Sequence, residues 1–75
     1  MPKDSYTASL FAEGLEKICA KVEEESEEVI WAAKTETRLR LIEESVDVLY
    51  HLFVLLVEKE ITLEEIAKEL KMRRK

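Results

Sequence analysis

Two short acidic motifs place carboxylates at spacings that suit a metal site in a helical protein. The first is Glu24-Glu25-x-x-Glu28, and the second is Glu43-Glu44-x-x-Asp47. Residues three or four apart lie on one face of a helix, so each motif presents carboxylates to one side. Oxygen ligands of this kind suit hard cations such as Mg²⁺ or Mn²⁺. The motifs therefore indicate a site for such an ion, although carboxylates paired with Lys or Arg produce the same pattern.

The helical positions of the first motif argue against an ordinary solvated acidic face. At about 100° per residue, Glu25 falls between Val22 and Val29 in the apolar stripe of its helix. Glu24 and Glu28 lie on the flank of that stripe. A carboxylate on an apolar face is costly unless it is paired or binds a metal. The position of Glu25 therefore favours a metal ligand.

The second motif repeats the pattern. Glu44, Asp47 and His51 follow one another at i, i+3 and i+7 and lead into an almost wholly apolar segment. Two facing helices with inward carboxylates are typical of metal sites in the cores of helical bundles. His51 is a candidate ligand, general base or substrate contact. The alternative is a hydrogen-bonded histidine one turn from Asp47.

The elements that must position these residues are helices. Pro2 and Gly14 are the only strong breakers, so the sequence predicts an all-α fold. The first helix is expected to begin near Ser5 or Thr7 and to end near Lys34, and Gly14 can bend or interrupt it. The residues expected on its buried face are Leu15, Ile18, Val22, Val29 and Ala32.

The second helix is expected to begin between Thr35 and Thr37 and to end near Lys59. The residues expected in its main apolar stripe are Leu39, Ile42, Val46, Leu49, Phe53 and Leu56. Its second half is apolar almost all round, and such a helix is buried on every side. One chain of this length has too few other elements to cover it, so we predict that it also packs against a partner subunit.

The third helix has the clearest start signal. Thr62-x-x-Glu65 predicts a capping box, and Ile61 and Ile66 have the spacing of a hydrophobic staple. The residues expected on its buried face are Leu63, Ile66, Ala67 and Leu70. We therefore expect a single domain over residues 1–75, a small bundle of about three helices per chain that oligomerisation completes.

Composition narrows the class further. The chain has 75 residues and one cysteine, so a disulfide within one chain is impossible. A lone Cys19 fits a small core residue in a reducing, cytoplasmic setting. The longest apolar run, residues 48–57, is too short to span a membrane, and the polar start shows no signal peptide. The net charge of −5 argues against nucleic-acid binding. The basic tail 71–75 is interpreted as a helix C-terminus that complements its own dipole.

Flanking segments make the two motifs more specific. The ExxE and ExxD pattern, here Glu25-x-x-Glu28 and Glu44-x-x-Asp47, resembles the hallmark of the all-α NTP pyrophosphatase superfamily, which includes MazG-type enzymes. Further segments resemble the phosphoribosyl-ATP pyrophosphohydrolase family, and they are SYTA at 5–8, GLEKI at 14–18, AAK at 32–34, EESVDVLYHL at 43–52 and ITLEEI at 61–66. The likeness covers nearly the whole chain. Members usually have Gly in place of Glu23 and another helix before SYTA, which this chain is expected to lack.

The resemblance implies magnesium-dependent hydrolysis of phosphoribosyl-ATP to phosphoribosyl-AMP and pyrophosphate, the second step of histidine biosynthesis, in a homodimer or higher homo-oligomer. It assigns the metal to four residues, Glu25, Glu28, Glu44 and Asp47. Glu24 is a further ligand or a base that orients water. Lys17, Lys21 and Lys34 are candidate phosphate contacts, or surface lysines paired with nearby Glu. Trp31 lies off the main stripe, either exposed, against another subunit or against a base.

Three other interpretations stay open at this level. A MazG-type nucleoside triphosphate pyrophosphohydrolase shares the metal motif and differs in the flanking segments. A non-catalytic helical interaction module explains the helices, but gives Glu25 and Asp47 no reason to face inward. A degenerate or truncated enzyme would fold without activity.

Overall fold

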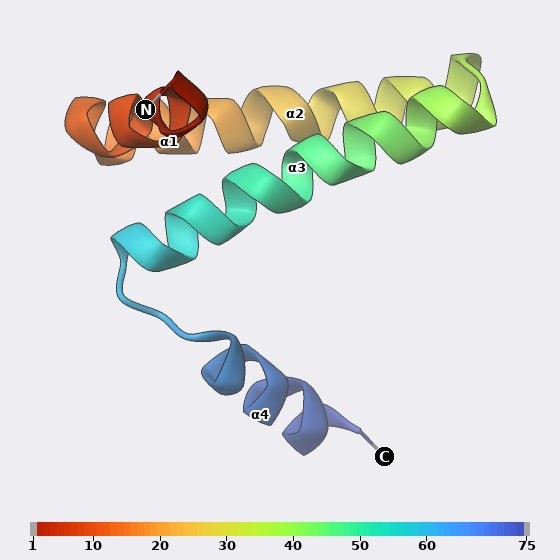
Figure 1. Ribbon diagram of the computed structural model, residues 1–75. Coiled ribbons are helices and arrows are strands. Elements are labelled where there is room, and N and C mark those ends of the chain that lie inside the picture. The colour runs from red at the N-terminus through yellow and green to blue at the C-terminus, as the bar shows by residue number, and fades with distance from the viewer. Residues whose placement is uncertain (1, 75) are drawn as a thin grey trace.

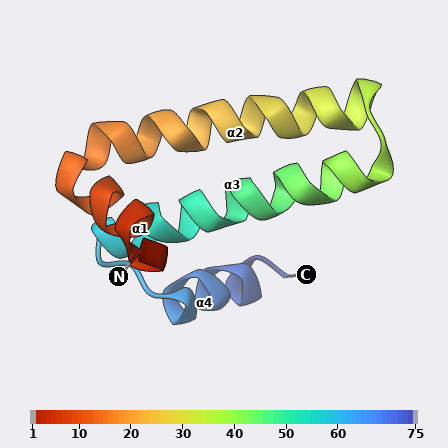
Figure 2. The same ribbon diagram turned by 45° about the horizontal axis from the view of Figure 1, so that its top comes forward.

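The computed structural model describes the backbone of residues 2–74 and the side chains of residues 6–74, so Met1 and the last residue of the basic tail, Lys75, lie outside it. The described chain is all-α. Its four helices are α1 (Pro2–Glu13), α2 (Leu15–Thr35), α3 (Arg38–Glu58) and α4 (Leu63–Arg73). The long helices α2 and α3 form an antiparallel hairpin, α1 folds back beside it, and α4 extends away (Figures 1 and 2). None of the described helices has the length and apolarity needed to cross a membrane.

Gly14 divides the expected first helix into α1 and α2. Its φ of +98° and ψ of −176° lie in a region that L-residues rarely adopt. The chain therefore reverses there, and α1 packs against α2 instead of continuing its line. The helix expected from Ser5 or Thr7 to Lys34 is thus interrupted at Gly14, which is one of the two outcomes predicted for this glycine.

Capping side chains set the other helix starts where the sequence predicts them. The Thr37 hydroxyl accepts a hydrogen bond from the Arg40 N–H at 3.2 Å, so α3 begins at the expected place. At α4 the capping box is complete: the Glu65 N–H donates to the Thr62 hydroxyl at 3.1 Å, and the Thr62 N–H donates to the Glu65 carboxylate at 2.8 Å. Both N-terminal predictions are confirmed.

The end of α3 is a Schellman turn. The Ile61 N–H donates to the Leu56 carbonyl at 2.8 Å, and the Glu60 N–H donates to the Val57 carbonyl at 3.0 Å. Glu60 takes the left-handed conformation with φ of 59°. This turn ends α3 and changes the direction of the chain, so that α4 extends away from the hairpin (Figure 1).

The core within one chain is small. Leu10, Ile18 and Val54 are its fully or nearly fully buried apolar residues, and they join α1, α2 and α3 at one end of the hairpin. Further along, Ala32 is buried on α2. The expected inward face of α2 is largely confirmed, except that Leu15 is exposed.

Several side chains expected in the core are exposed. No residue of α4 is buried, so the prediction that its apolar side chains face inward was wrong for one chain, because α4 packs against no other helix extensively. The exposed residues of that predicted face are Leu63, Ile66, Ala67 and Leu70. Cys19 is also exposed, because it lies on the side of α2 away from α3.

The apolar stripe predicted for α3 is exposed as well. Leu39, at 62%, and Val46, at 60%, are among its most exposed members. The side of α3 that packs on α2 instead carries Glu44, His51 and Val54. The hairpin therefore buries the side of α3 that bears Glu44 and His51 and leaves most of the apolar stripe uncovered.

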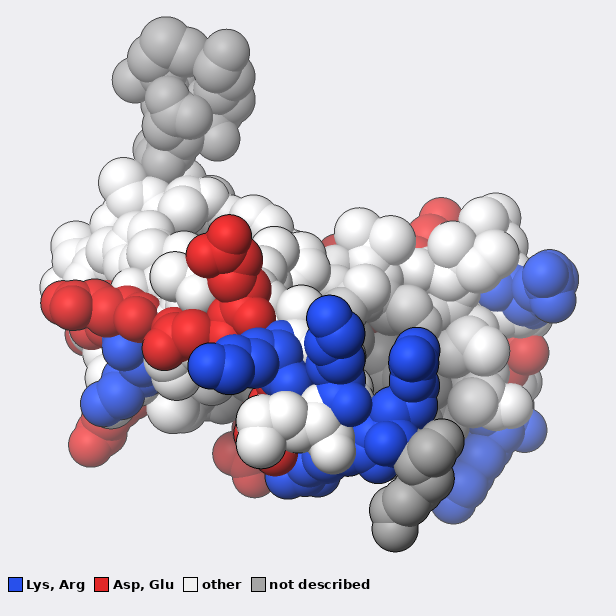
Figure 3. Space-filling model, turned by 90° about the horizontal axis from the view of Figure 1, so that it is seen from below, with Lys and Arg blue, Asp and Glu red and all other residues white. Residues whose placement is uncertain are grey.

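Charges are segregated on the surface. On the face seen from below, Lys and Arg side chains gather beside a separate group of Asp and Glu side chains (Figure 3). Within α4, Glu64 and Glu65 occupy the first turn and Lys71 and Arg73 the last. This order complements the helix dipole, which agrees with the interpretation of the basic tail.

We predict that Gly14→Ala lowers the free energy of unfolding by about 1–3 kcal/mol, because a strained backbone conformation costs that much. A Cβ at Gly14 meets no atom within 4 Å, so the penalty comes from the backbone and not from a clash. Urea denaturation measures it.

D-Alanine at position 14, introduced by chemical synthesis, is the matched control. Its preferred conformations are mirror images of those of L-alanine, so it fits the positive φ and is expected to retain stability. Equal destabilisation by both residues would contradict the conformational explanation.

Candidate metal centre

Three carboxylates from two helices meet inside the hairpin. Glu25 and Glu28 project from α2 and Glu44 projects from α3, and each offers an oxygen within 4.8 Å of the others. Glu25 is only 8% exposed and Glu44 only 6%, whereas Glu28 lies nearer the surface. The sequence prediction that the two motifs face each other and that Glu25 points inward is therefore confirmed.

Two of the buried oxygens have no hydrogen-bond partner within the described chain. They are Oε1 of Glu25 and Oε1 of Glu44. The other oxygen of each group has a cation nearby: Lys21 Nζ lies 3.8 Å from Glu25 Oε2, and the Arg40 guanidinium pairs with Glu44 Oε2. An unpartnered buried carboxylate oxygen is costly. The donor set and the orphaned oxygens fit a hard divalent cation.

The surroundings of Glu44 raise the pKa of its carboxyl group. The neighbouring Glu28 carboxyl is the main cause that raises the pKa of Glu44, followed by burial and by the charge of Asp47. Arg40 acts in the opposite direction and lowers that pKa. Without a cation, these surroundings thus disfavour the charged form of Glu44. A metal ion at this position would favour that charged form instead.

Asp47 does not join the three clustered carboxylates. Its side chain is exposed, although its charge still contributes to the raised pKa of Glu44. Its backbone carbonyl accepts a hydrogen bond from Nδ1 of His51. The hairpin therefore brings together three of the four expected ligands and leaves the fourth at the rim.

An acidic hollow of about 540 Å³ opens beside the cluster. Its lining residues are Glu24, Glu27, Glu28, Trp31, Glu36, Arg40 and Glu44. Arg40 pairs with three carboxylates there, those of Glu36, Glu43 and Glu44. Arg40 was not among the residues predicted for the site. Its position one helical turn before Glu44 could have indicated that the two side chains pair.

Known proteins are similar to this chain in sequence. The model of the family described as phosphoribosyl-ATP pyrophosphohydrolase matches residues 1–74. The chain belongs to this family. No solved structure matches the chain.

Relatives named phosphoribosyl-ATP pyrophosphatase include proteins of Clostridium botulinum, 57% identical over 70 residues, Clostridium novyi, 53% over 73, and Leptospira biflexa, 51% over 73. These matches cover 93%, 97% and 97% of this chain and 64%, 66% and 79% of the respective relatives. The chain thus spans about two thirds of the length of the first two.

The two segments that carry the family resemblance most distinctly meet in space. Tyr6, from SYTA, donates its hydroxyl proton to Nε2 of His51, from YHL, at 2.6 Å. Nδ1 of His51 donates to the Asp47 carbonyl at 2.9 Å, which fixes the tautomer. Thr7 also hydrogen-bonds Tyr50. Burial is the main cause that raises the pKa of Tyr6, which keeps its hydroxyl protonated as a donor.

These contacts favour the structural interpretation of His51. Its ring is 5% exposed, and both nitrogens are engaged within the chain. The histidine therefore ties α1 to α3 one turn from Asp47. Sequence reasoning did not find Tyr6 as its partner, because the two residues are 45 positions apart.

The candidate lysines occupy different surroundings. Lys21 Nζ donates to Glu24 at 3.1 Å, and this hydrogen bond is the main cause that raises the pKa of Lys21. Glu24 is itself exposed at the hollow. Lys17 and Lys34 are exposed, and Lys34 lies in the last turn of α2. Only Lys21 therefore lies beside the carboxylate cluster.

We predict that the metal-free protein loses stability as the pH rises. Because the folded state raises the pKa of Glu44, it binds more protons than the unfolded state between the unfolded and folded pKa values. The stabilisation is complete below the unfolded pKa and is lost as the pH rises through the folded pKa. Urea denaturation in EDTA from acidic to neutral pH measures this slope.

Glu44→Gln is expected to remove this contribution to the slope. Glu43→Gln, an exposed neighbour that pairs with the same guanidinium, is the control and should keep it. Saturating Mg²⁺ should flatten the slope of the unaltered protein. An identical slope in the Glu44→Gln protein would contradict the assignment.

Proposed function

We propose that this chain hydrolyses phosphoribosyl-ATP at its α–β phosphoanhydride and releases phosphoribosyl-AMP and pyrophosphate. Family membership gives the substrate, since the relatives are named for this activity. The observation that carries the proposal is the carboxylate cluster of Glu25, Glu28 and Glu44, in which two buried oxygens lack a partner. Cys19 is a free, exposed cysteine, and such thiols are typical of a reducing environment. This supports a cytoplasmic location.

The proposed cofactor is Mg²⁺, and Mn²⁺ has the same ligand preference. Glu25, Glu28 and Glu44 would hold it, and Asp47 at the rim is proposed as the fourth ligand. When bound, such an ion neutralises phosphate charge and lowers the pKa of a bound water. An acidic hollow would otherwise repel a polyphosphate.

The chain's own residues supply positioning and charge. Glu24 is proposed to orient the attacking water as a base, because it is exposed at the hollow beside the cluster. Lys21, held against Glu24 and Glu25, offers an ammonium to the phosphates. Arg40 offers a guanidinium, which suits phosphate oxygens. Lys17 and Lys34 stay candidates for contacts with the outer part of the substrate.

The direct test is Glu44→Gln, which keeps the shape and removes the charge. We expect the rate of pyrophosphate release from phosphoribosyl-ATP with Mg²⁺ to fall by about two orders of magnitude, the scale for losing one group that stabilises transition-state charge. Glu23→Gln makes the same change at an exposed position of α2 as the control. A panel that includes dNTPs tests the MazG-type alternative, and preference for dNTPs would refute the proposed substrate.

A second part of the proposal concerns assembly: we propose that a second copy of the chain covers the exposed stripe of α3. The exposed members of this stripe repeat at alternating spacings of three and four, the pattern of a helix-packing seam, and they are Leu39, Ile42, Val46, Leu49 and Phe53. The exposed Val57 follows Phe53 one turn later and extends this surface. An uncovered apolar surface of this length is typical of an interaction site.

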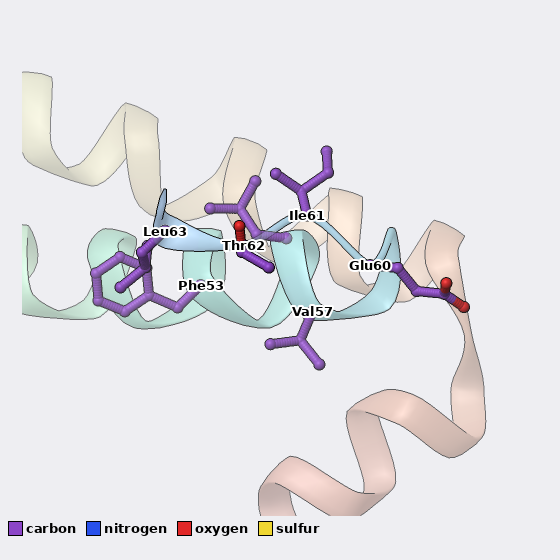
Figure 4. Close-up of a pocket in the computed structure, with 7 residues that line it drawn as sticks. Phe53, Val57, Glu60, Ile61, Thr62 and Leu63 are labelled. Carbon is purple, nitrogen blue, oxygen red and sulfur yellow. The ribbon is translucent and has the colours of Figure 1, made fainter. Parts of the chain in front are cut away.

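The junction of α3 and α4 extends this surface. An apolar hollow of about 560 Å³ lies there. Figure 4 shows Phe53 and Val57 from α3, Ile61 and Thr62 from the connection, and Leu63 from α4 around it. The otherwise isolated α4 would gain a packing surface from a partner seated here. This supports a homodimer or higher homo-oligomer as the active form.

Leu49→Glu is expected to break this assembly, because a charge in the middle of an apolar interface loses its hydration. Light scattering should give at least twice the 8.8 kDa chain mass for the unaltered protein and a lower mass for the variant. Leu49→Met keeps the side chain apolar and is the matched control. A stable, fully active monomer would refute this part of the proposal.

A further inference from the structure

Trp31 is an uncovered aromatic side chain at the edge of the acidic hollow. It is 61% exposed and is the only tryptophan of the chain. It follows Glu28 by three residues on α2, so both side chains lie on the same side of that helix and line the same hollow. A large exposed indole face beside carboxylates is unusual for packing within one chain, because Trp is highly buried on average.

The hollow has two chemically different parts. One part is acidic and is formed by Glu28 and Glu44, two members of the carboxylate cluster. Glu44 is more than nine-tenths buried behind this part, and its Oε1 has no partner among the described residues. Trp31 supplies its aromatic part. The volume of about 540 Å³ is in the range of small-molecule sites. A ligand that fits both parts carries anionic groups that a cation can bridge to the carboxylates, together with an uncharged planar group.

The charges around Trp31 argue against a protein partner on this surface. Glu24, Glu27, Glu28 and Glu36 line the hollow with it, whereas the exposed stripe of α3 is wholly apolar. Covering four carboxylates with another subunit would remove their hydration. A small ligand avoids this cost because it covers the ring and leaves the outer carboxylates in water.

We propose that Trp31 is the stacking platform for the adenine ring of the nucleotide substrate, and this inference rests on the proposed function. Every base has a π face, and stacking on an aromatic side chain needs no hydrogen bond from the protein. The base itself bears no phosphate group, so the acidic walls repel it less than they repel the triphosphate. With the base on Trp31, the phosphates extend toward Glu28 and Glu44, and the tryptophan sets the orientation of the substrate.

The lone tryptophan makes the proposal directly measurable. Intrinsic fluorescence of the full chain with Mg²⁺ is recorded while AMP is added, and ribose 5-phosphate and inorganic pyrophosphate serve as base-free controls. We expect saturable quenching by AMP and little by either base-free compound, because only the base reaches the indole. Equal responses to AMP and to the base-free compounds, or no response to AMP, would overturn the proposal.

Steady-state kinetics supply the second arm. Trp31→Ala should raise KM for phosphoribosyl-ATP by about tenfold, within the range for loss of one stacked base, and leave kcat within about twofold. Trp31→Phe keeps a stacking face and should stay within about threefold of the unaltered KM. Ile30→Ala, an exposed neighbour that does not line the hollow, is the control. Melting temperature and mass by light scattering should be unchanged in all three.

The Trp31 platform and the proposed function can be refuted independently of each other. If the unaltered protein hydrolyses phosphoribosyl-ATP and Trp31→Ala has an unchanged KM, the platform is refuted and the proposed function stands. If phosphoribosyl-ATP is not hydrolysed but AMP alone quenches Trp31, the platform stands and the proposed function is refuted. A Trp31→Ala protein that loses its oligomeric mass would show a subunit contact instead of a base platform.

Discussion

Burial of like charges between α2 and α3 is the constraint on which the rest of this structure depends. Glu25 and Glu44 occupy positions that apolar residues fill in an ordinary helix pair, and Glu28 offers an oxygen within 4.8 Å of theirs. Their mutual repulsion opposes closure of the hairpin. A bound cation would attract all three carboxylates. The residues that destabilise the metal-free hairpin would then stabilise the metal-bound one.

The remaining contacts are arranged around this strain. Lys21 and Arg40 each place a cation beside one buried carboxylate and leave its other oxygen bare. At the far end of the hairpin, Leu10, Ile18 and Val54 form a dry cluster, and the Tyr6–His51 hydrogen bond ties α1 to α3. The buried apolar cluster thus lies at one end, separate from the clustered carboxylates.

The distribution of exposed apolar surface follows from the same constraint. A helix has one face for each neighbour, and α3 turns its carboxylate-bearing face toward α2. Its apolar stripe is then left outside, together with α4 and the hollow at their junction. The described helices do not cover both faces of α3, and this uncovered face is the basis of the proposed second copy.

The sequence by itself determined the local features. Thr37 and Thr62 begin their helices because a side-chain oxygen next to a helical segment satisfies a free N–H, and this requires no distant residue. Periodicity likewise placed Glu25 on the inward face of α2. The acidic motifs and their flanking segments were sufficient to indicate the family, because they are contiguous in the chain.

Only the tertiary structure decided which side of α3 meets α2, because periodicity identifies an apolar face without saying what covers it. That choice exposed Leu49, buried Glu44 and left Asp47 at the rim of the cluster. The pairing of Tyr6 with His51 joins residues far apart in the chain. The position of Trp31 beside the carboxylate cluster likewise depends on how the two helices close, and no local pattern encodes that angle.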